Sequence, residues 1–416
     1  MINKIKQKIY KLLRISEKYT KTDMVYLAKG SFWLTAEQII LSICSFLLAI
    51  AFANLLPRET YGVYKYILSI ASLLTIPTLT GINTAIIQAV ARGYEGSFIK
   101  GLKTKIHWGL LGGLASLILA VYYYFNNNTT LVFAFLIIGI FVPFMDSLLI
   151  YNALLIGKKK FKICTKYNII IRTLSFVIMI FVLFLTDNIF LIIFTYFLSN
   201  TLLRSLFLFI TIKKFKPNKK KDPETISYGK HLSLINVISV IADNLDKILI
   251  FHYLGAIELA IYTFATVPPI QIRKLCKNIT TLAFPKLAQR KISEIKKTLP
   301  RKMLKFLIII IPIVIIYILI APYLYKFIFP QYTNAIFYSQ IFVLILLLYP
   351  KGLMATIFVT HSYKKETYFI NITMSIIKIA LLLILLPFYG ILGAILAIIG
   401  TEFISLILLI FLFRKL

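Results

Sequence analysis

Apolar runs long enough to cross a membrane recur along the whole chain, and they limit its possible folds more than any other feature. Each run is at least about 18 residues long, and about 20 apolar residues suffice for a helix to span a bilayer. Hydrophobic residues make up 59% of the 416 residues and the mean hydropathy is +0.86, well beyond what a soluble domain tolerates. A transmembrane barrel would instead show strands of about ten residues with alternating polarity. The sequence therefore predicts an all-α polytopic membrane protein.

Twelve membrane-spanning segments are predicted, joined by short connections on one side and by basic connections on the other. They are placed at residues 28–55, 61–91, 105–125, 131–156, 167–186, 188–212, 232–254, 257–285, 303–325, 335–359, 367–386 and 390–413. By this placement 41 of the 47 Lys and Arg residues fall on one side, three fall opposite, and three lie deep inside spans. The positive-inside rule then places both termini in the cytoplasm.

The same asymmetry accounts for most of the formal net charge of +32. Basic loops beside a bilayer set its topology and attract anionic lipid headgroups, so membrane lipids are expected partners and nucleic acid is not. The cysteines have neither metal nor disulfide spacing, and no cofactor or metal is expected.

The longest interior loop divides six predicted spans from six. We predict a cytoplasmic amphipathic segment at 1–27, a six-helix bundle at 28–212, a cytoplasmic linker at 213–231 and a second six-helix bundle at 232–413. The stretches "FANLLPRETYGVY" and "FHYLGAIELAIY" echo each other after the first span of each half. This echo indicates a parallel internal repeat.

Four stretches point to a family. "LPRETYGVYKYILSI", "GINTAIIQAVARGYEGSF", "DNLDKILIFHYLG" and "IELAIYTFA" resemble the polysaccharide (O-antigen type) flippases of the MOP exporter superfamily, and the resemblance extends over the whole chain. It implies a MATE-like fold, with two six-helix bundles around a central cavity that opens alternately to each side. It also implies a non-enzymatic flippase for polyprenyl-pyrophosphate-linked oligosaccharides, in contact with the polysaccharide polymerase machinery.

Polar residues within the predicted spans are the candidates for function, because a charge at the bilayer centre costs about 2.5–3.5 kcal/mol or more. Cations are expected to line the cavity and bind pyrophosphate, with amides beside them. The substrate-binding candidates are Arg273, Lys274, Lys277, Lys378, Lys351, Gln38, Asn83, Gln88 and Arg92. The candidates for coupling to a proton or sodium ion are Asp243, Asp246, Glu402 and Glu37. The pair Pro268–Pro269 is expected to break or bend the eighth span beside its cations.

Structural roles for the same residues remain open. Asp243 or Asp246 could form an internal ion pair with Lys247, and Lys378 could pair with Glu402 on the next span. The cations of the eighth span could extend to the headgroups from the end of a short span.

Two other functions are weighed against transport of lipid-linked saccharides. A membrane polymerase or ligase usually carries catalytic residues on a long external loop, and the longest external loop here is short and has no acidic residue. A drug or cation antiporter of the same superfamily should have an anionic or neutral cavity, whereas these spans contain several deep cations. The sequence therefore favours the flippase.

Overall fold

The computed structural model describes residues 24–288, 292–361 and 363–415, without the side chains of residues 24–32, 34, 275–288, 293 and 364. Nearly all of these residues are helical, and no strand occurs among them. Most of the predicted amphipathic segment at 1–27 lies outside the described residues, as does the side chain of Lys277.

The first half of the chain consists of helices α2 to α9. They are α2 (Met24–Leu55), α3 (Arg58–Leu74), α4 (Gly81–Ala91), α5 (Gly96–Phe125), α6 (Thr129–Met145), α7 (Tyr151–Gly157), α8 (Phe161–Leu185) and α9 (Ile189–Phe215), with short 3₁₀ turns at Ile76–Thr78 and Ser147–Ile150. The second predicted span is divided into α3 and α4, which are bent by 47° at the break. Pro77 lies in this break, where its missing N–H interrupts the helical hydrogen bonds.

The second half consists of α10 to α15. These are α10 (Thr225–Leu254), α11 (Ala256–Ala288), α12 (Ile292–Ile328), α13 (Ile336–Phe342), α14 (Gly352–Thr360) and α15 (Lys364–Lys415), with 3₁₀ segments η3 (Pro330–Ala335) and η4 (Val343–Lys351). The helix α15 covers the last two predicted spans, which meet at Gly390, where φ is +57°. Glycine tolerates this conformation because it has no Cβ.

Of the predicted break or bend at Pro268–Pro269, the break does not occur, since α11 is one helix through both prolines. Both prolines are buried, and their fixed φ is itself helical, so packing from neighbouring helices holds the segment together.

Eight of the described helices are long and apolar enough to cross a membrane, and the bent pair of α3 and α4 raises the number to nine. The two predicted spans in α15 count once among these, and α10 and α11 carry more polar residues. With these taken into account, the helices follow the twelve predicted spans.

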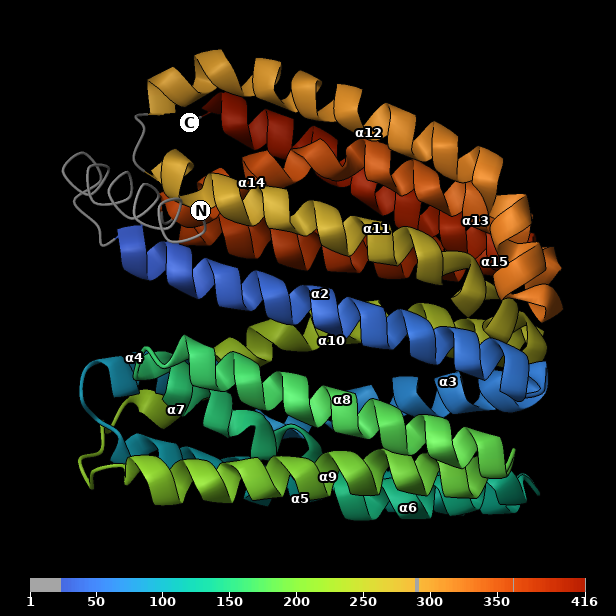
Figure 1. Cartoon of the computed structure of the whole chain (residues 1–416), viewed down its shortest axis with the longest axis horizontal. Coiled ribbons are helices and arrows are strands. Elements are labelled where there is room, and N and C mark those ends of the chain that lie inside the picture. The colour runs from blue at the N-terminus through green and yellow to red at the C-terminus, as the bar shows by residue number, and fades with distance from the viewer. Residues whose placement is uncertain (1–23, 289–291, 362, 416) are drawn as a thin grey trace, which may run out of the picture.

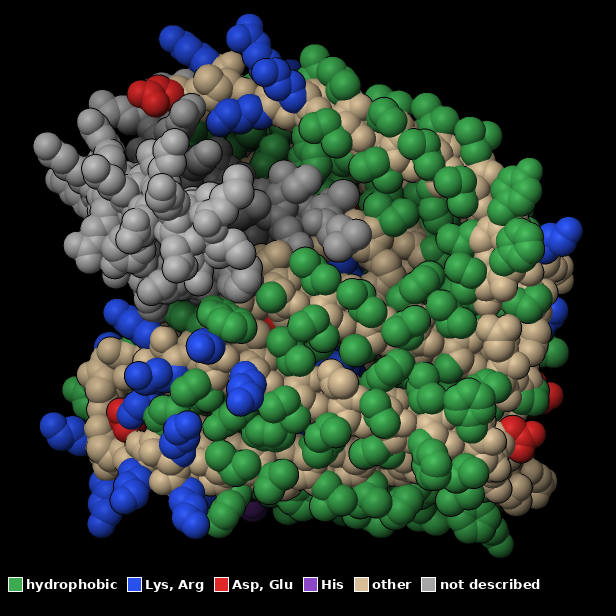
Figure 2. Space-filling model, viewed as in Figure 1, with side chains coloured by type: hydrophobic (Ala, Val, Ile, Leu, Met, Phe, Trp, Pro, Cys, Tyr) green, Lys and Arg blue, Asp and Glu red, His purple; other side chains and the backbone are tan. Residues whose placement is uncertain are grey.

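The helices run along the long axis of the molecule (Figure 1). The helices α11 to α15 lie above and α5 to α9 below, while α2 and α10 lie between them. The helix α2 packs against α8 and α11, and α10 packs against α3, α4 and α15. On the face drawn in Figure 2, Lys and Arg side chains gather mainly toward the left edge, and hydrophobic side chains are spread widely over the rest of the described surface. This distribution is what a bilayer requires of a spanning protein.

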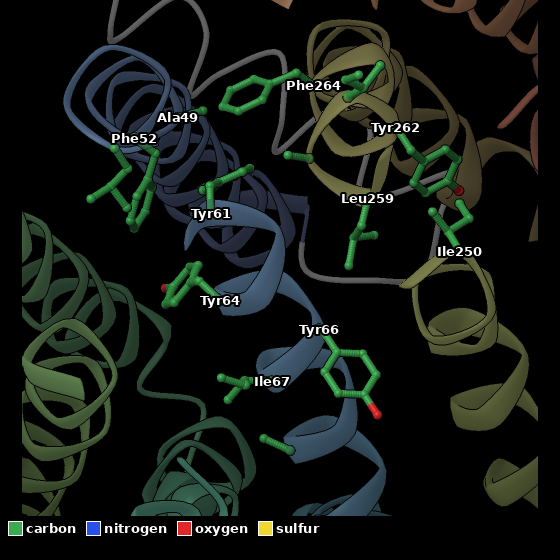
Figure 3. Close-up of a cluster of buried hydrophobic side chains, with 14 of the residues drawn as sticks. Ala49, Phe52, Tyr61, Tyr64, Tyr66, Ile67, Ile250, Leu259, Tyr262 and Phe264 are labelled. Carbon is green, nitrogen blue, oxygen red and sulfur yellow. The ribbon is translucent and has the colours of Figure 1, made fainter. Parts of the chain in front are cut away.

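The two halves meet closely near the end of the molecule opposite the basic loops (Figure 3). Tyr61 of α3 stacks on Phe264 of α11 with ring centroids 4.7 Å apart, and Tyr66 stacks on Phe251 at 3.9 Å. A Cβ atom at Gly62 would lie 1.8 Å from the backbone oxygen of Ala256. The approach of α3 to α11 therefore depends on a residue without a side chain.

At the basic end, the segment between α9 and α10 is bonded to the connection between α4 and α5. The Gly96 amide donates to the carbonyl of Lys220 at 2.8 Å, and the Asp222 amide donates to Ser97 Oγ at 2.9 Å. The beginning of α10 also contacts the first half, because the Gly81 amide donates to Ser233 Oγ at 3.0 Å. The predicted linker is thus attached to the first half of the chain.

Candidate functional site

One carboxylate organises the polar residues in the second half of the chain. Glu402 of α15 accepts hydrogen bonds from Arg273 of α11 at 2.9 Å and from Lys351 of η4. The Lys351 ammonium also donates to the backbone carbonyl of Glu402 at 2.9 Å. The three side chains are partly buried. The single negative charge of Glu402 stabilises both cations. We call Arg273, Lys351 and Glu402 the C-half triad.

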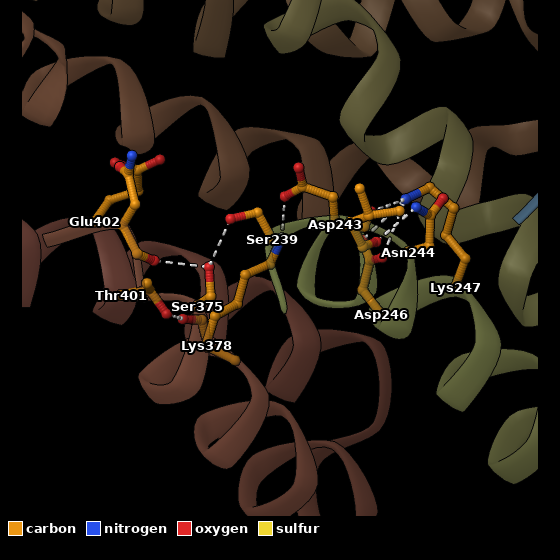
Figure 4. Close-up of polar contacts among 12 residues, drawn as sticks. Ser239, Asp243, Asn244, Asp246, Lys247, Ser375, Lys378, Thr401 and Glu402 are labelled. Atoms are coloured by element: carbon orange, nitrogen blue, oxygen red, sulfur yellow. Dashed lines mark hydrogen bonds and ion pairs between the residues drawn. The ribbon is translucent and has the colours of Figure 1, made fainter. Parts of the chain in front are cut away.

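Lys378 forms its ion pair with Asp243 of α10 (Figure 4), at 3.2 Å. The alternative pairing with Glu402 is therefore wrong, because Glu402 is occupied by Arg273 and Lys351. Beside this pair, Ser239 and Ser375 are 3.3 Å apart and connect α10 to α15. The Asp243 side chain is 75% exposed, although it lies well inside a spanning helix. A carboxylate facing lipid would be costly, so this face of α10 must meet a polar space.

Asp246 is buried and fully engaged. It accepts from Lys247 at 3.0 Å and from the hydroxyl of Tyr262 at 2.5 Å. The predicted internal ion pair of Asp246 with Lys247 is confirmed.

Four cations from both halves of the chain come close enough for their charges to interact. Lys247 of α10 and Lys274 of α11 act electrostatically on Lys65 of α3, and Arg172 of α8 acts on Lys274. Lys65 also lies over the rings of two tyrosines of its own helix, at 5.2 and 5.8 Å. Within the described part of the chain, no ion pair involves Lys65, Arg172 or Lys274. We call Lys65, Arg172, Lys247 and Lys274 the interhalf cations.

A second polar region lies within the first half and surrounds a cavity of about 200 Å³. Glu37 of α2 accepts from Asn168 of α8 at 2.8 Å, while its other carboxylate oxygen is buried without a hydrogen-bond partner. Arg172 and Arg204 line the same cavity. Because it combines one carboxylate with two guanidinium groups, the cavity carries an excess of positive charge.

A neighbouring cavity of about 250 Å³ contains Asp146 and Arg204. Lys105 is completely buried, and its ammonium donates to Asp146 at 2.6 Å and to Asn83 at 3.0 Å. Arg204 donates to the Met145 carbonyl at 2.5 Å, and its Nε is buried without a partner. We call the residues that line these two cavities, together with Lys105, the N-half cluster.

The remaining predicted residues lie apart from these groups. Gln38 donates to Ser42 at 3.4 Å within its own helix, and Gln88 is exposed. Arg92 forms an ion pair with Asp222 of the linker at 2.5 Å. The structure thus brings Arg273 and Lys351 together and leaves Arg92 with the linker.

Sequence reasoning missed Lys105, Arg172 and Arg204, which lie near the cytoplasmic ends of predicted spans and were counted with the basic loops. The signal that could have found them is Asp146, because an acid within a span needs a cation close by. No group of three or more His, Cys, Asp or Glu side chains suited to a metal ion occurs among residues 24–288, 292–361 and 363–415.

Comparison with known proteins gives one family and a set of similar folds. A family model described as "Polysaccharide biosynthesis protein" matches residues 27–272, more than half of the chain. No curated protein sequence matches the chain significantly.

The solved structures that resemble this chain include a lipid II flippase and several MATE proteins. The lipid II flippase MurJ, in an inward closed conformation, is 16% identical over 92% of this chain and 87% of its own, with a TM-score of 0.68. A MATE protein in complex with MaD5 is 14% identical over 93% of this chain and 95% of its own, with a TM-score of 0.62. An inward-facing multidrug resistance MATE family transporter of the MOP superfamily is 14% identical over 91% and 94%, with a TM-score of 0.60. At these identities the likeness shows the fold, and the expected MATE-like architecture is confirmed.

Proposed function

Because this chain belongs to the polysaccharide biosynthesis protein family, we propose that it moves a lipid-linked saccharide across a membrane and catalyses no covalent step. The substrate class is a polyprenyl-pyrophosphate-linked oligosaccharide, carried from the cytoplasmic to the outer leaflet of a bacterial plasma membrane. The similarity of the fold to a lipid II flippase supports this proposal. The shared fold also supports alternating access, in which the substrate site is open first to one side and then to the other.

The interhalf cations carry the proposal. Lys247 is paired with Asp246, but Lys65, Arg172 and Lys274 are not in ion pairs among the described residues, and like charges repel strongly where water is scarce. A pyrophosphate between them would relieve this repulsion and would keep hydrogen-bonding partners while it leaves water. Since Lys65 and Arg172 belong to the first half and Lys247 and Lys274 to the second, such a ligand would hold the two halves together.

The membrane potential would favour export of an anion. Moving one negative charge outward against an inside-negative potential of 100 mV releases about 2.3 kcal/mol. Coupling to a proton or sodium ion would add to this force. Asp243, Asp246 and Glu402 are each paired with a cation, whereas one oxygen of Glu37 is buried without a partner. Glu37 is therefore the best-supported coupling residue, and Asp243 is the next because its side chain is 75% exposed.

An antiporter of drugs or cations is the alternative, because similar folds include multidrug transporters. The cavity around Glu37 is the observation that favours it, since a carboxylate oxygen there is buried and unpaired. Arg172 and Arg204 line that same cavity and would repel a cationic drug. The balance of charge supports an anionic substrate.

The decisive experiment measures lipid-linked saccharide on each leaflet of cells that lack the protein. We expect the saccharide to accumulate on the cytoplasmic leaflet, and complementation with the wild-type chain to clear it. The variant Lys65→Met with Arg172→Met and Lys274→Met should reach the membrane and fail to clear it. A control with three exposed basic-side residues changed, Lys100→Met with Lys159→Met and Lys219→Met, should complement normally. Cells without any lipid-linked saccharide would point instead to an enzyme.

The proposed direction requires both termini in the cytoplasm. Single cysteines introduced at Asn127 and Lys220 lie at opposite ends of the helices. An impermeant thiol reagent added to intact cells should label the first and spare the second. Equal labelling of both would contradict the orientation.

A further inference from the structure

One further cavity lies away from the groups described above and shares only Lys351 with them. It has a volume of about 620 Å³ and lies among α12, η4, α14 and the last turns of α15. Most of its lining is aliphatic, and its ends are defined by Lys296 and Leu307 on α12 and by Leu406 and Arg414 on α15. We call it the α12–α15 groove.

The groove has one charged end and one apolar end. The start of α12, which carries Lys296, and the end of α15, which carries Arg414, lie at the left end of Figure 1, and the Lys296 ammonium donates to the Arg414 carbonyl at 3.3 Å. From Lys296 to Leu307 the helix rises by about 16 Å, which matches half of a hydrocarbon core about 30 Å thick. The groove therefore has the length of one membrane leaflet and a cationic rim at headgroup level.

We propose that the α12–α15 groove binds one anionic glycerophospholipid of the leaflet on the basic side of the protein. The phosphate lies between Lys296 and Arg414, and an acyl chain follows the aliphatic lining toward the middle of the bilayer. Cationic side chains favour a charged phosphate over a zwitterionic headgroup, and burial of the acyl chain supplies the remaining affinity.

Charge also argues against the other occupant that the chain offers. Residues 1–23 have apolar residues at helical spacing, but they are rich in lysine. Placed in the groove, they would bring positive charge against Lys296 and Arg414. An anionic lipid complements this rim, and the protein's own N-terminal segment does not.

The groove reaches the C-half triad through one residue. Lys351 lines the groove, and its ammonium is bonded to Glu402, which also holds Arg273. A bound acyl chain would limit the movement of Lys351 and so stabilise the pairing in the triad. The lipid is thus a structural ligand of the second half of the chain, whichever substrate the protein carries.

The test measures binding of single lipids to the purified full chain in detergent by native mass spectrometry. Phosphatidylglycerol and phosphatidylcholine with identical acyl chains are compared. The wild-type chain should bind phosphatidylglycerol at least about tenfold more tightly, which corresponds to one charge-assisted hydrogen bond or more. Lys296→Gln with Arg414→Gln should remove this preference, and Leu307→Trp should reduce binding of both lipids.

A matched control changes the same number of charges one residue away. Lys297→Gln with Lys415→Gln alters two exposed cations that do not line the groove, and it should leave the preference unchanged. Circular dichroism and the thermal midpoint of each variant confirm that it is folded. An unfolded Leu307→Trp variant is replaced by Leu406→Phe, which fills the same groove.

Four results would overturn the proposal. The first is equal binding of both lipids by the wild-type chain, and the second is loss of the preference in the control variant. The third is a tenfold gain in lipid binding after deletion of residues 1–23, which would make that segment the occupant. Stronger binding of polyprenyl phosphate than of phosphatidylglycerol would likewise make the groove part of the transport route.

Discussion

The C-half triad and the N-half cluster both hold charged side chains inside the membrane, but they stabilise these charges in different ways. The carboxylate of Glu402 is paired with two cations, Arg273 and Lys351, and Lys351 also donates to its backbone carbonyl. In the N-half cluster, Glu37 and Arg204 each retain a buried polar atom without a partner, and both line a cavity. Leaving such an atom unpaired costs about 1–3 kcal/mol. The comparison indicates a structural centre in the second half and a region able to accept water or an ion in the first.

Lys105 offers the strongest test of this comparison. It belongs to the N-half cluster, but its buried ammonium has hydrogen-bond partners in Asp146 and Asn83. Lys105→Met removes the cation beside Asp146 and should destabilise the protein by about 3–5 kcal/mol, as in other buried pairs that lose one partner. Thermal unfolding in detergent measures the loss. Adding Asp146→Asn should recover most of it, and failure of this rescue would show that Lys105 acts through packing alone.

Glu402→Gln tests whether the carboxylate of Glu402 stabilises the C-half triad. It leaves Arg273 and Lys351 without their anion, and we expect a loss of about 2 kcal/mol, below the ~3–5 kcal/mol of fully buried pairs because the side chains are partly exposed. Glu294→Gln, at an exposed site on α12, is the control for loss of a carboxylate. A stable Glu402→Gln protein that no longer transports would make the triad a functional site and would reverse the comparison.

The pair of Lys378 with Asp243 lies between these extremes, since Asp243 is largely exposed. Lys378→Met should change stability by no more than about 1 kcal/mol, as for other exposed pairs. If the lysine contacts the substrate, transport per protein in the membrane should fall at least about tenfold, while Lys378→Arg retains part of it. Transport that recovers in Lys378→Met with Asp243→Asn would assign the pair a structural role.

Glu37→Gln should have the smallest effect on stability. The amide oxygen can still accept from Asn168, and the oxygen that is replaced has no partner, so the change in unfolding free energy should stay within about 0.5 kcal/mol. Transport in proteoliposomes should, however, lose its dependence on a proton or sodium gradient. An unchanged gradient dependence would remove Glu37 from the coupling residues and leave Asp243.

The all-α fold and the order of the spans could be predicted because hydrophobic length and the short connections are local properties of the sequence, and the family could be predicted from the resemblance of four short stretches. Pairing between helices could not. The stripe that contains Asn371, Ser375 and Lys378 fixes one face of a helix but not the helix which that face meets, and Lys378 therefore pairs with Asp243 of a distant helix. The division into domains and the assignment of site residues to substrate remain predictions.

Errors at the ends of spans had a different cause. Lys105 and Arg172 lie within a few residues of the predicted boundaries, so a small shift moved them from the membrane to the basic loops. Whether Pro268 and Pro269 break the helix could not be predicted, because the effect of a proline depends on whether neighbouring helices hold the segment, and that information is not local.

Gly62 has a consequence for how the sequence can change over generations. Any other residue there would force its Cβ into the backbone of Ala256, and exchanging the side chain of Ala256 cannot relieve the collision. Neighbouring aromatic positions can drift in compensating pairs, because a smaller ring on α3 can be matched by a larger one on α11. Position 62 has no such partner, so substitution there wedges the two halves apart at the end opposite the basic loops. Substitutions of Gly62 should therefore be absent from a population, even where every residue around it varies.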